Sequence, residues 1–236
     1  MLIDTGDGLI LIDGGLPQSA PLINKSIRAL GFRTRDIQYI LVSHVHYDHV
    51  GGIAALQRLS GATVLASRKA RTALLRGELA ADDPQHDTKD SNNRFPAVAN
   101  VRAVEDLETI VLGKTTITGH FTPGHTPGGM SWAWRSCEGP VCRQLVYADS
   151  LSPISADGFR FSDGPGFVAQ DLRESAARIS NLDCDIFLSN HPVFFDMQRK
   201  LESNSPDRFA NAGACRSYAN SSLVRLQQRL QQEASR

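Results

Sequence analysis

Ile37-Gln38-Tyr39-Ile40-Leu41-Val42-Ser43-His44-Val45-His46-Tyr47-Asp48-His49 is the stretch that decides the fold of this chain. Its first six residues are mostly apolar and β-branched, which predicts a buried strand followed by a loop. Core packing does not require three imidazoles and a carboxylate within the six residues of that loop. Zinc does bind such ligands, so the motif predicts a metal site.

The spacing inside the motif predicts two neighbouring metal positions. His44 and His46 are two residues apart, so an extended backbone points both rings the same way. Asp48 and His49 follow a bend and are expected to face an adjacent position. Gly51-Gly52 then lets the backbone turn closely past the site before a helix begins.

Two more histidines follow apolar strands. His125 lies in Thr122–Gly129, after the strand-like Thr115–Phe121, and prolines and glycines on both sides predict a tight loop. His191 comes directly after Ile186–Asn190, which also reads as a strand. Loops at strand ends are where α/β scaffolds place their chemistry. We therefore expect both side chains to complete the metal site.

The remaining histidines and two serines have plainer interpretations. We interpret His120 as a packed histidine or one that supports a ligand, and His86 as a solvated side chain. Ser43 and Ser189 are expected to form turn or supporting hydrogen bonds. Residues 78–98 form a long polar loop that contains His86, and a loop of this length is usually functional or mobile.

Hydrophobic periodicity predicts the other elements. The predicted helices are 22–30 (stripe Leu22, Ile23, Ile27, Leu30), 53–59 (Ile53, Leu56, Leu59), 70–75, 167–179, and a last one capped by Ser205 or Asp207 (Tyr218, Leu223, Leu226, Leu230). The predicted strands are 2–5, 9–13, 63–66, 130–135 and 145–147, and residues 231–236 are expected to fray. Strands that alternate with helices in this order predict an α/β fold with sheets packed face to face and helices outside.

Length and composition predict one domain spanning residues 1–236. Lys plus Arg equal Asp plus Glu at 25 each, and this zero net charge argues against nucleic acid as a partner. Apolar runs are too short to span a membrane. We expect a small-molecule substrate and a monomer, although the sequence does not determine the oligomeric state.

The four cysteines suggest an oxidising compartment. Cys137 and Cys142 flank the tip of a predicted hairpin, across which a disulfide is plausible. The alternative is that all four are reduced, buried thiols.

Taken together, the His-x-His-x-Asp-His motif, the Thr-Pro-Gly-His-Thr loop and the late strand-end histidine resemble the metallo-β-lactamase superfamily over nearly the whole chain. The chain is most similar to class B β-lactamases of the third subclass. The resemblance implies a four-layer αββα sandwich that binds two Zn²⁺ ions per chain. By the same resemblance, His44, His46 and His125 would hold the first ion, and Asp48, His49 and His191 the second.

The resemblance also implies roles for other residues. Asp48 would be catalytic by orienting the nucleophile, and Ser150 and Ser152 would bind the substrate carboxylate, with Gln85 as a further substrate contact. Asp149 is open: an aspartate in this region bridges the metals in many relatives that are not lactamases, but we favour Ser150 at the metal-facing position. The similar lactamases also have a buried Asp-Gly turn, here Asp13-Gly14-Gly15, and a disulfide resembling a Cys184–Cys215 pair.

The implied activity is hydrolysis of penicillins, cephalosporins and carbapenems by a metal-bound hydroxide, and hence antibiotic resistance. Ser67-Arg68-Lys69-Ala70 does not match the Ser-x-x-Lys motif of serine β-lactamases. Two alternatives stay open: another dinuclear metallohydrolase acting on thioesters, lactones or phosphoesters, and a non-catalytic, truncated zinc-binding protein.

The start of the sequence bears on location. Met1 is followed directly by strand sequence, without a signal peptide or the N-terminal strands of the relatives. We expect a mature or truncated form of a periplasmic or secreted protein, or a sequence with a misassigned start.

Overall fold

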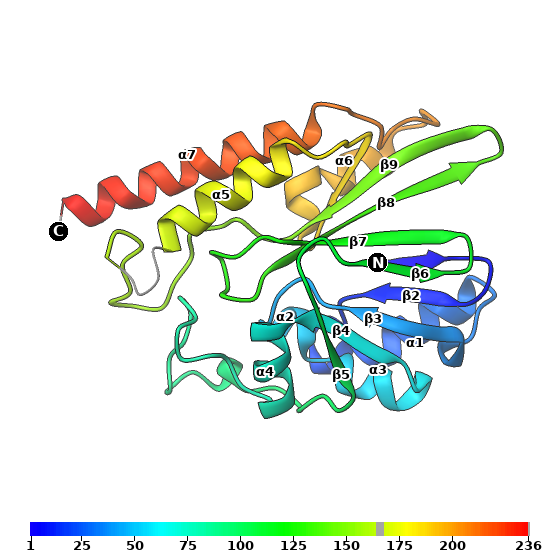
Figure 1. The fold of residues 1–236 in the computed structure, drawn as a ribbon, viewed down its shortest axis with the longest axis horizontal. Coiled ribbons are helices and arrows are strands. Elements are labelled where there is room, and N and C mark those ends of the chain that lie inside the picture. Colours follow the sequence, from blue (N-terminus) through cyan, green and yellow to red (C-terminus); the bar gives the residue numbers. More distant parts are fainter. Residues whose placement is uncertain (164–167, 236) are drawn as a thin grey trace.

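The computed structural model describes residues 1–163 and 168–235. The strands of this part form two five-stranded sheets, in the orders β1-β2-β3-β4-β5 and β10-β9-β8-β7-β6. The two sheets lie face to face, with α5 and α7 side by side on one outer side and α1, α3 and α4 on the other (Figure 1). The expected four-layer αββα sandwich is therefore confirmed.

The first sheet carries the metal-binding motif. Its strands are β1 (Leu2–Asp4), β2 (Leu9–Ile12), β3 (Ile37–Leu41), β4 (Thr63–Ser67) and β5 (Val101–Val104). Its helices are α1 (Ala20–Ala29), α2 (Tyr47–Val50), α3 (Ile53–Ser60) and α4 (Arg68–Arg76). Strands β2 to β5 are parallel, so their carboxyl ends, and the loops that follow, meet at one edge of the sheet.

The second sheet is a meander with one added parallel strand. Its strands are β6 (Thr109–Leu112), β7 (Thr115–Phe121), β8 (Met130–Glu138), β9 (Val141–Ala148) and β10 (Ile186–Ser189). Strands β6 to β9 pair antiparallel, and β10 runs parallel to β9. The helices that follow β9 are α5 (Val168–Ser180), α6 (Met197–Glu202) and α7 (Ala214–Ala234).

Apolar side chains from both sheets fill the space between them. Ile12 and Leu41 of the first sheet belong to the same buried cluster as Ile117 and Trp132 of the second. Trp132 is fully buried, and its Nε1 donates a hydrogen bond to the Val42 carbonyl at 3.1 Å. The core therefore fixes the backbone where β3 ends and the motif begins.

Three residues expected on the buried faces of the first two predicted helices are exposed. Leu22 and Leu30 are each 65% exposed and Leu59 is 52% exposed. The inward face of α1 is set by Ala20 and Ile27, and Leu22 lies about 140° around the helix from Ile27 at 100° per residue. Leu59 lies in the last turn of α3, past the buried residues of that helix.

The last helix differs from its prediction at both ends. It begins at Ala214 after Gly213, and not from a cap at Ser205 or Asp207, which precede it in a turn. It also runs through Ala234 instead of fraying from 231, because Glu233 is buried and held by hydrogen bonds. Within its predicted stripe, Tyr218 and Leu226 are buried, whereas Leu223 is 37% exposed. The helix predicted from Phe167 spans Val168–Ser180, and Phe167 lies outside the described residues.

All four cysteines form disulfides. Cys137 faces Cys142 across the β8–β9 hairpin, whose strands are longer than the sequence suggested, and Cys184 pairs with Cys215. Both pairings are confirmed. In the described part of the chain, every helix is too short or too polar to cross a bilayer.

Candidate metal centre

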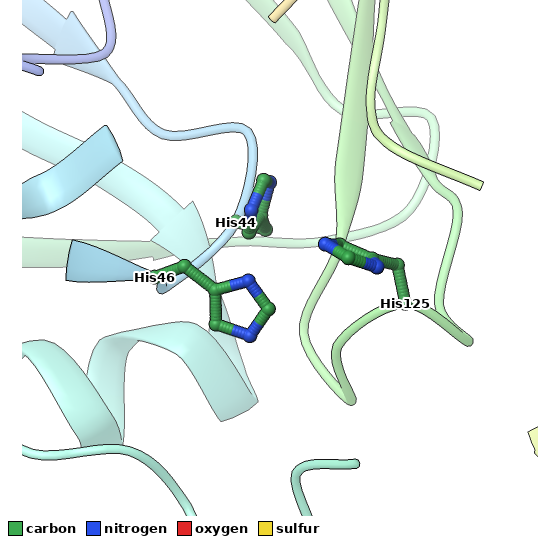
Figure 2. A group of neighbouring side chains, drawn as sticks. All are labelled: His44, His46 and His125. Atoms are coloured by element: carbon green, nitrogen blue, oxygen red, sulfur yellow. The ribbon is translucent and has the colours of Figure 1, made fainter. Parts of the chain in front are cut away.

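Two loops, one from each sheet, meet where the sheets end. The segment after β3 carries His44 and His46, and the turn after β7 carries His125. Figure 2 shows these three rings pointing toward one another from separate parts of the chain. The ring centroids are 4.7 to 4.9 Å apart, and the planes are close to perpendicular. We call His44, His46 and His125 the three-histidine group.

Each ring of the three-histidine group is held from behind. His44 Nδ1 lies 2.7 Å from Asp149 Oδ1, and His125 Nδ1 lies 2.8 Å from the Ser152 carbonyl oxygen. His46 is held through Nε2, 3.2 Å from Asp83 Oδ1. An acceptor on one ring nitrogen keeps the proton there, so the other nitrogen is free to bind a metal.

The open nitrogens fit a metal ion. One ligand atom from each ring lies within 4.8 Å of the others, and all three side chains are buried. His44 Nε2 is buried without a hydrogen-bond partner, a condition that a native structure rarely leaves unexplained. Burial, together with the neighbouring histidines, lowers the pKa of His44 and of His125 well below its ordinary value. Both rings are therefore neutral at pH 7, as metal binding requires.

Asp48, His49 and His191 form a second cluster, which we call the Asp-His-His group. Asp48 and His49 lie on α2, and His191 follows β10. His49 Nε2 is 3.3 Å from both His191 Nε2 and Asp48 Oδ2, and the three ligand atoms lie within 4.8 Å of one another. The His44 and His49 ring centroids are 4.1 Å apart, so the two groups adjoin.

Carboxylates make the Asp-His-His group attractive to cations. Burial would lower the pKa of His49, but hydrogen bonds with Asp13 and Asp48 outweigh it and raise the pKa to about 10. Burial would likewise raise the pKa of Asp48, but the hydrogen bond with His49 holds it below its ordinary value. The position at His49 Nε2 therefore favours positive charge, which a metal ion would supply in place of a proton.

Asp13 links the motif to the β2 edge. Its carboxylate accepts hydrogen bonds from Ser43 N at 2.8 Å, Ser43 Oγ at 2.7 Å and Tyr147 Oη at 3.1 Å. Glycine at position 14 also lets this turn pack closely against the start of α3, because a Cβ at Gly14 would lie 2.8 Å from Ile53 N. This turn is the Asp-Gly turn that the sequence suggested, and it orients both Ser43 and His49.

Asp149 does not belong to either ligand group. Its Oδ1 accepts hydrogen bonds from His44 and from Asn190 Nδ2, the latter at 3.2 Å, and a Cβ at Gly129 would collide with its Oδ2. Burial raises the pKa of Asp149 well above its ordinary value. The carboxylate thus lies behind the His44 ring and is part of neither ligand group. The preference for Ser150 at the metal-facing position stays a prediction.

The predicted substrate-binding residues lie around the same loops. Ser150 and Ser152 are buried, and Tyr218 Oη accepts a hydrogen bond from Leu151 N at 2.9 Å between them. Gln85 Nε2 lies 3.4 Å from His46 Nδ1, at the edge of the three-histidine group. Their part in binding substrate stays a prediction.

Several residues were interpreted correctly as outside the ligand groups, and others were missed. His120 and His86 are partly buried and belong to neither group, and Ser43 makes a supporting hydrogen bond. Sequence reasoning missed Asp83, Asn190 and the partner role of Asp149. The signal for Asp83 was its place in a long polar loop, which does not distinguish it from Asp82 or Asp87.

A cavity of about 410 Å³ opens beside the Asp-His-His group. Asp48, His49 and His191 line one part of it, and Ile23 and Ile27 of α1 line another. Asp48 and His191 are 48% and 39% exposed at their side chains, so this group faces the solvent. A ligand with an apolar portion would fit between the metal-binding edge and α1.

Comparison with known proteins finds metallo-β-lactamases among the proteins similar to this chain. The family model of the metallo-β-lactamase superfamily matches residues 1–191. The crystal structure of MEM-A1, a subclass B3 metallo-β-lactamase from a soil metagenome library, matches with a TM-score of 0.94 and 45% identity, covering 99% of this chain and 89% of that one. The Rm3 metallo-β-lactamase matches with a TM-score of 0.95 and 43% identity, covering 99% and 87%.

Curated relatives are more distant. The N-acyl homoserine lactonase AttM of Agrobacterium fabrum is 32% identical over 146 residues, which are 62% of this chain and 52% of that protein. The chain spans about half the length of the curated relatives it matches.

Proposed function

The chain belongs to the metallo-β-lactamase superfamily, and from that premise we propose that it is a β-lactamase that opens the β-lactam amide with two zinc ions. The observation that carries the proposal is the pair of adjoining ligand groups, each with its ligand atoms within 4.8 Å. Matches above 40% identity and 0.9 TM-score to solved B3 enzymes support β-lactams as the substrate class.

The ligand types support zinc. Three imidazoles at one position and two imidazoles with a carboxylate at the other are ligand sets that zinc accepts. Neither group contains a cysteine or a fourth protein ligand, so each leaves coordination positions for water or substrate, as catalytic zinc sites do. Zinc in such sites lowers the pKa of a bound water to about 7 and polarises a carbonyl oxygen.

The chain's own residues have separate tasks in this proposal. Asp48 would hold the second ion, and its half-exposed carboxylate would orient the attacking water. Ser150 and Ser152 bind the substrate carboxylate, and Gln85 contacts the substrate from the 78–98 loop. Asp13, Asp149 and the Ser152 carbonyl keep the histidine rings in the orientation that binding needs.

The substrate range and location extend this proposal. We propose penicillins, cephalosporins and carbapenems as substrates, with their apolar side chains received by the cavity beside α1. We also propose a single domain that works in the periplasm or outside the cell, where its two disulfides are stable.

A lactonase is the second candidate, because AttM shares 32% identity with this chain. A lactone and a β-lactam both present a cyclic acyl group to the same nucleophile. The partner role of Asp149 behind His44 favours the β-lactam, since an aspartate that bridged the metals was the feature expected of the general hydrolases.

The experiment compares substrates on one zinc-loaded preparation. We expect a chromogenic cephalosporin to be hydrolysed with a kcat/KM orders of magnitude above that for an N-acyl homoserine lactone or a thioester. Elemental analysis should give two zinc ions per chain, chelators should abolish turnover, and serine-directed clavam inhibitors should leave it unchanged. Preference for the lactone or the thioester would replace the proposal, and zinc binding without any hydrolysis would favour a non-catalytic protein.

A further inference from the structure

Asp83 is a buried carboxylate that belongs to neither ligand group. Its side chain is 3% exposed, which is uncommon for an aspartate without a strong partner. Its Oδ1 lies 3.2 Å from His46 Nε2 and also accepts a hydrogen bond from the backbone N of Gln85 at 2.9 Å. A single oxygen atom thus joins a ring of the three-histidine group to the backbone of the 78–98 loop.

The loop around Asp83 is fastened on a second side. The Pro84 carbonyl accepts a hydrogen bond from Ala156 N at 2.9 Å, which ties it to the segment that follows Ser152. Farther along the loop, residues 87–92 are exposed. Residues 83–85 are therefore held in place at the metal-binding edge.

The contact with His46 decides which nitrogen faces the site. His44 and His125 are held at Nδ1, but His46 is held at Nε2. Without an acceptor at Nε2, the His46 ring would lose the bond that keeps its proton there and leaves Nδ1 unprotonated. A carboxylate acceptor behind a histidine ligand also increases the basicity of the ring toward the metal.

We propose that Asp83 is a positioning residue that orients His46 for the first zinc and, through the same oxygen, holds Gln85 at the mouth of the site. The proposal rests on the proposed zinc function. It makes zinc binding and the order of residues 83–85 dependent on each other: zinc on Nδ1 of His46 requires the proton on Nε2, and that proton binds Asp83.

The test compares Asp83→Ala, Asp83→Asn and the control Asp82→Ala. Asp82 is the neighbouring loop aspartate, half-exposed and paired with Lys69 at 3.5 Å, so it shares the loop but not the histidine. Each of the three substitutions is combined with His191→Ala, and the His191→Ala protein is the parent of the comparison. The His191→Ala substitution dismantles the Asp-His-His group and leaves one zinc position to titrate. Competition with a chromophoric chelator then gives the zinc affinity of the three-histidine group alone.

We expect Asp83→Ala to weaken zinc binding by about 10- to 100-fold, the usual effect of losing a carboxylate behind a histidine ligand. Asp83→Asn keeps an oxygen acceptor for both donors, so it should retain most of the affinity, and Asp82→Ala should match the parent. Cobalt(II) loading provides a second readout, because paramagnetic cobalt shifts the NMR resonance of the His46 ring N–H proton. This proton should exchange faster with solvent in Asp83→Ala. Hydrogen exchange at Gln85 N should slow when zinc is added to the parent and not to Asp83→Ala.

Two results would overturn the proposal: Asp83→Ala with a zinc affinity within about twofold of the parent, or equal losses in Asp83→Ala and Asp82→Ala. Equal losses in Asp83→Ala and Asp83→Asn with unchanged exchange at Gln85 would also overturn it. The proposed function fails separately, if the unaltered chain binds no zinc or hydrolyses no β-lactam. Far-UV circular dichroism of each variant identifies any loss of fold, and Asp83→Asn then remains as the test.

Discussion

Glu233, near the end of α7, fixes the segment that follows the Ser150–Ser152 loop, and replacing it tests how the C-terminal helix is held. Its carboxylate accepts hydrogen bonds from Phe161 N and Ser162 N, each at 2.9 Å, and from Arg229 Nε at 2.7 Å. Burial alone would raise the pKa of Glu233, but these donors outweigh it and lower the pKa from 4.5 to about 2.

We predict that Glu233→Gln destabilises the protein at pH 7 and much less in acid. A fall in pKa from 4.5 to about 2 corresponds to ~3 kcal/mol, and screening at the partly exposed Arg229 reduces the expected loss to about 2 kcal/mol. Because the folded-state pKa is the lower one, this stability is present above pH 4.5 and is lost as the pH falls from 4.5 toward 2. At pH 3 the difference between the two proteins should be about 1 kcal/mol or less.

The assay is urea unfolding followed by tryptophan fluorescence, with zinc removed from both proteins so that its release in acid does not contribute. Glu202→Gln, at an exposed position on α6, is the matched control and should change stability little at either pH. A loss of the same size at pH 7 and pH 3, or no loss at pH 7, would refute the reasoning.

Three further predictions concern the metal centre and the disulfides. Asp48→Ala should lower the affinity for the second zinc ion by about 100- to 1000-fold and leave the affinity for the first unchanged, because ~10–16 kcal/mol of zinc binding is shared among about four ligands. Two tightly bound zinc ions and full activity in this variant would contradict the prediction. Asp149→Ala should weaken the zinc bound by His44 by about 10- to 100-fold, and Asp149→Asn by less, in chelator competition. Replacing both Cys184 and Cys215 by alanine should lower the free energy of unfolding by ~4 kcal/mol, because the disulfide no longer closes a loop of 31 residues in the unfolded chain. An unchanged urea midpoint would argue against this.

The sequence predicted the ligand groups because each candidate ligand follows a strand that can be recognised locally. The apolar run at Ile37–Leu41 and the turn around His125 have short-range signatures, and parallel pairing brings the strand ends together. The acceptors behind the rings have no such signature. Asp149 is 105 residues from His44 in sequence and Asp83 is 37 residues from His46, so their contacts depend on how the sheets and loops pack.

Helix ends were predicted less well for a related reason. By hydrophobicity Leu22 is as good a candidate for burial as Ile27, and only the packing of α1 on the sheet selects the inward face. The polar tail of α7 has no apolar stripe to indicate burial. Its order depends on Glu233, whose partners are backbone groups 71 and 72 residues away.

The acceptors behind the histidines connect the metal centre to the whole fold. Asp13 follows β2, Asp83 lies in the 78–98 loop, and Asp149 and the Ser152 carbonyl lie in the segment after β9, so three separate segments orient four rings. Because β2 and β9 belong to different sheets, the complete site exists only when the sheets are packed. Zinc that binds only this arrangement stabilises it, by ~4 kcal/mol when free zinc is 1,000 times the Kd. Substitutions at any of the acceptors should therefore reduce both the zinc affinity and the stabilisation that zinc provides. Substitutions that only weaken the core should instead lower the stability with and without zinc by the same amount.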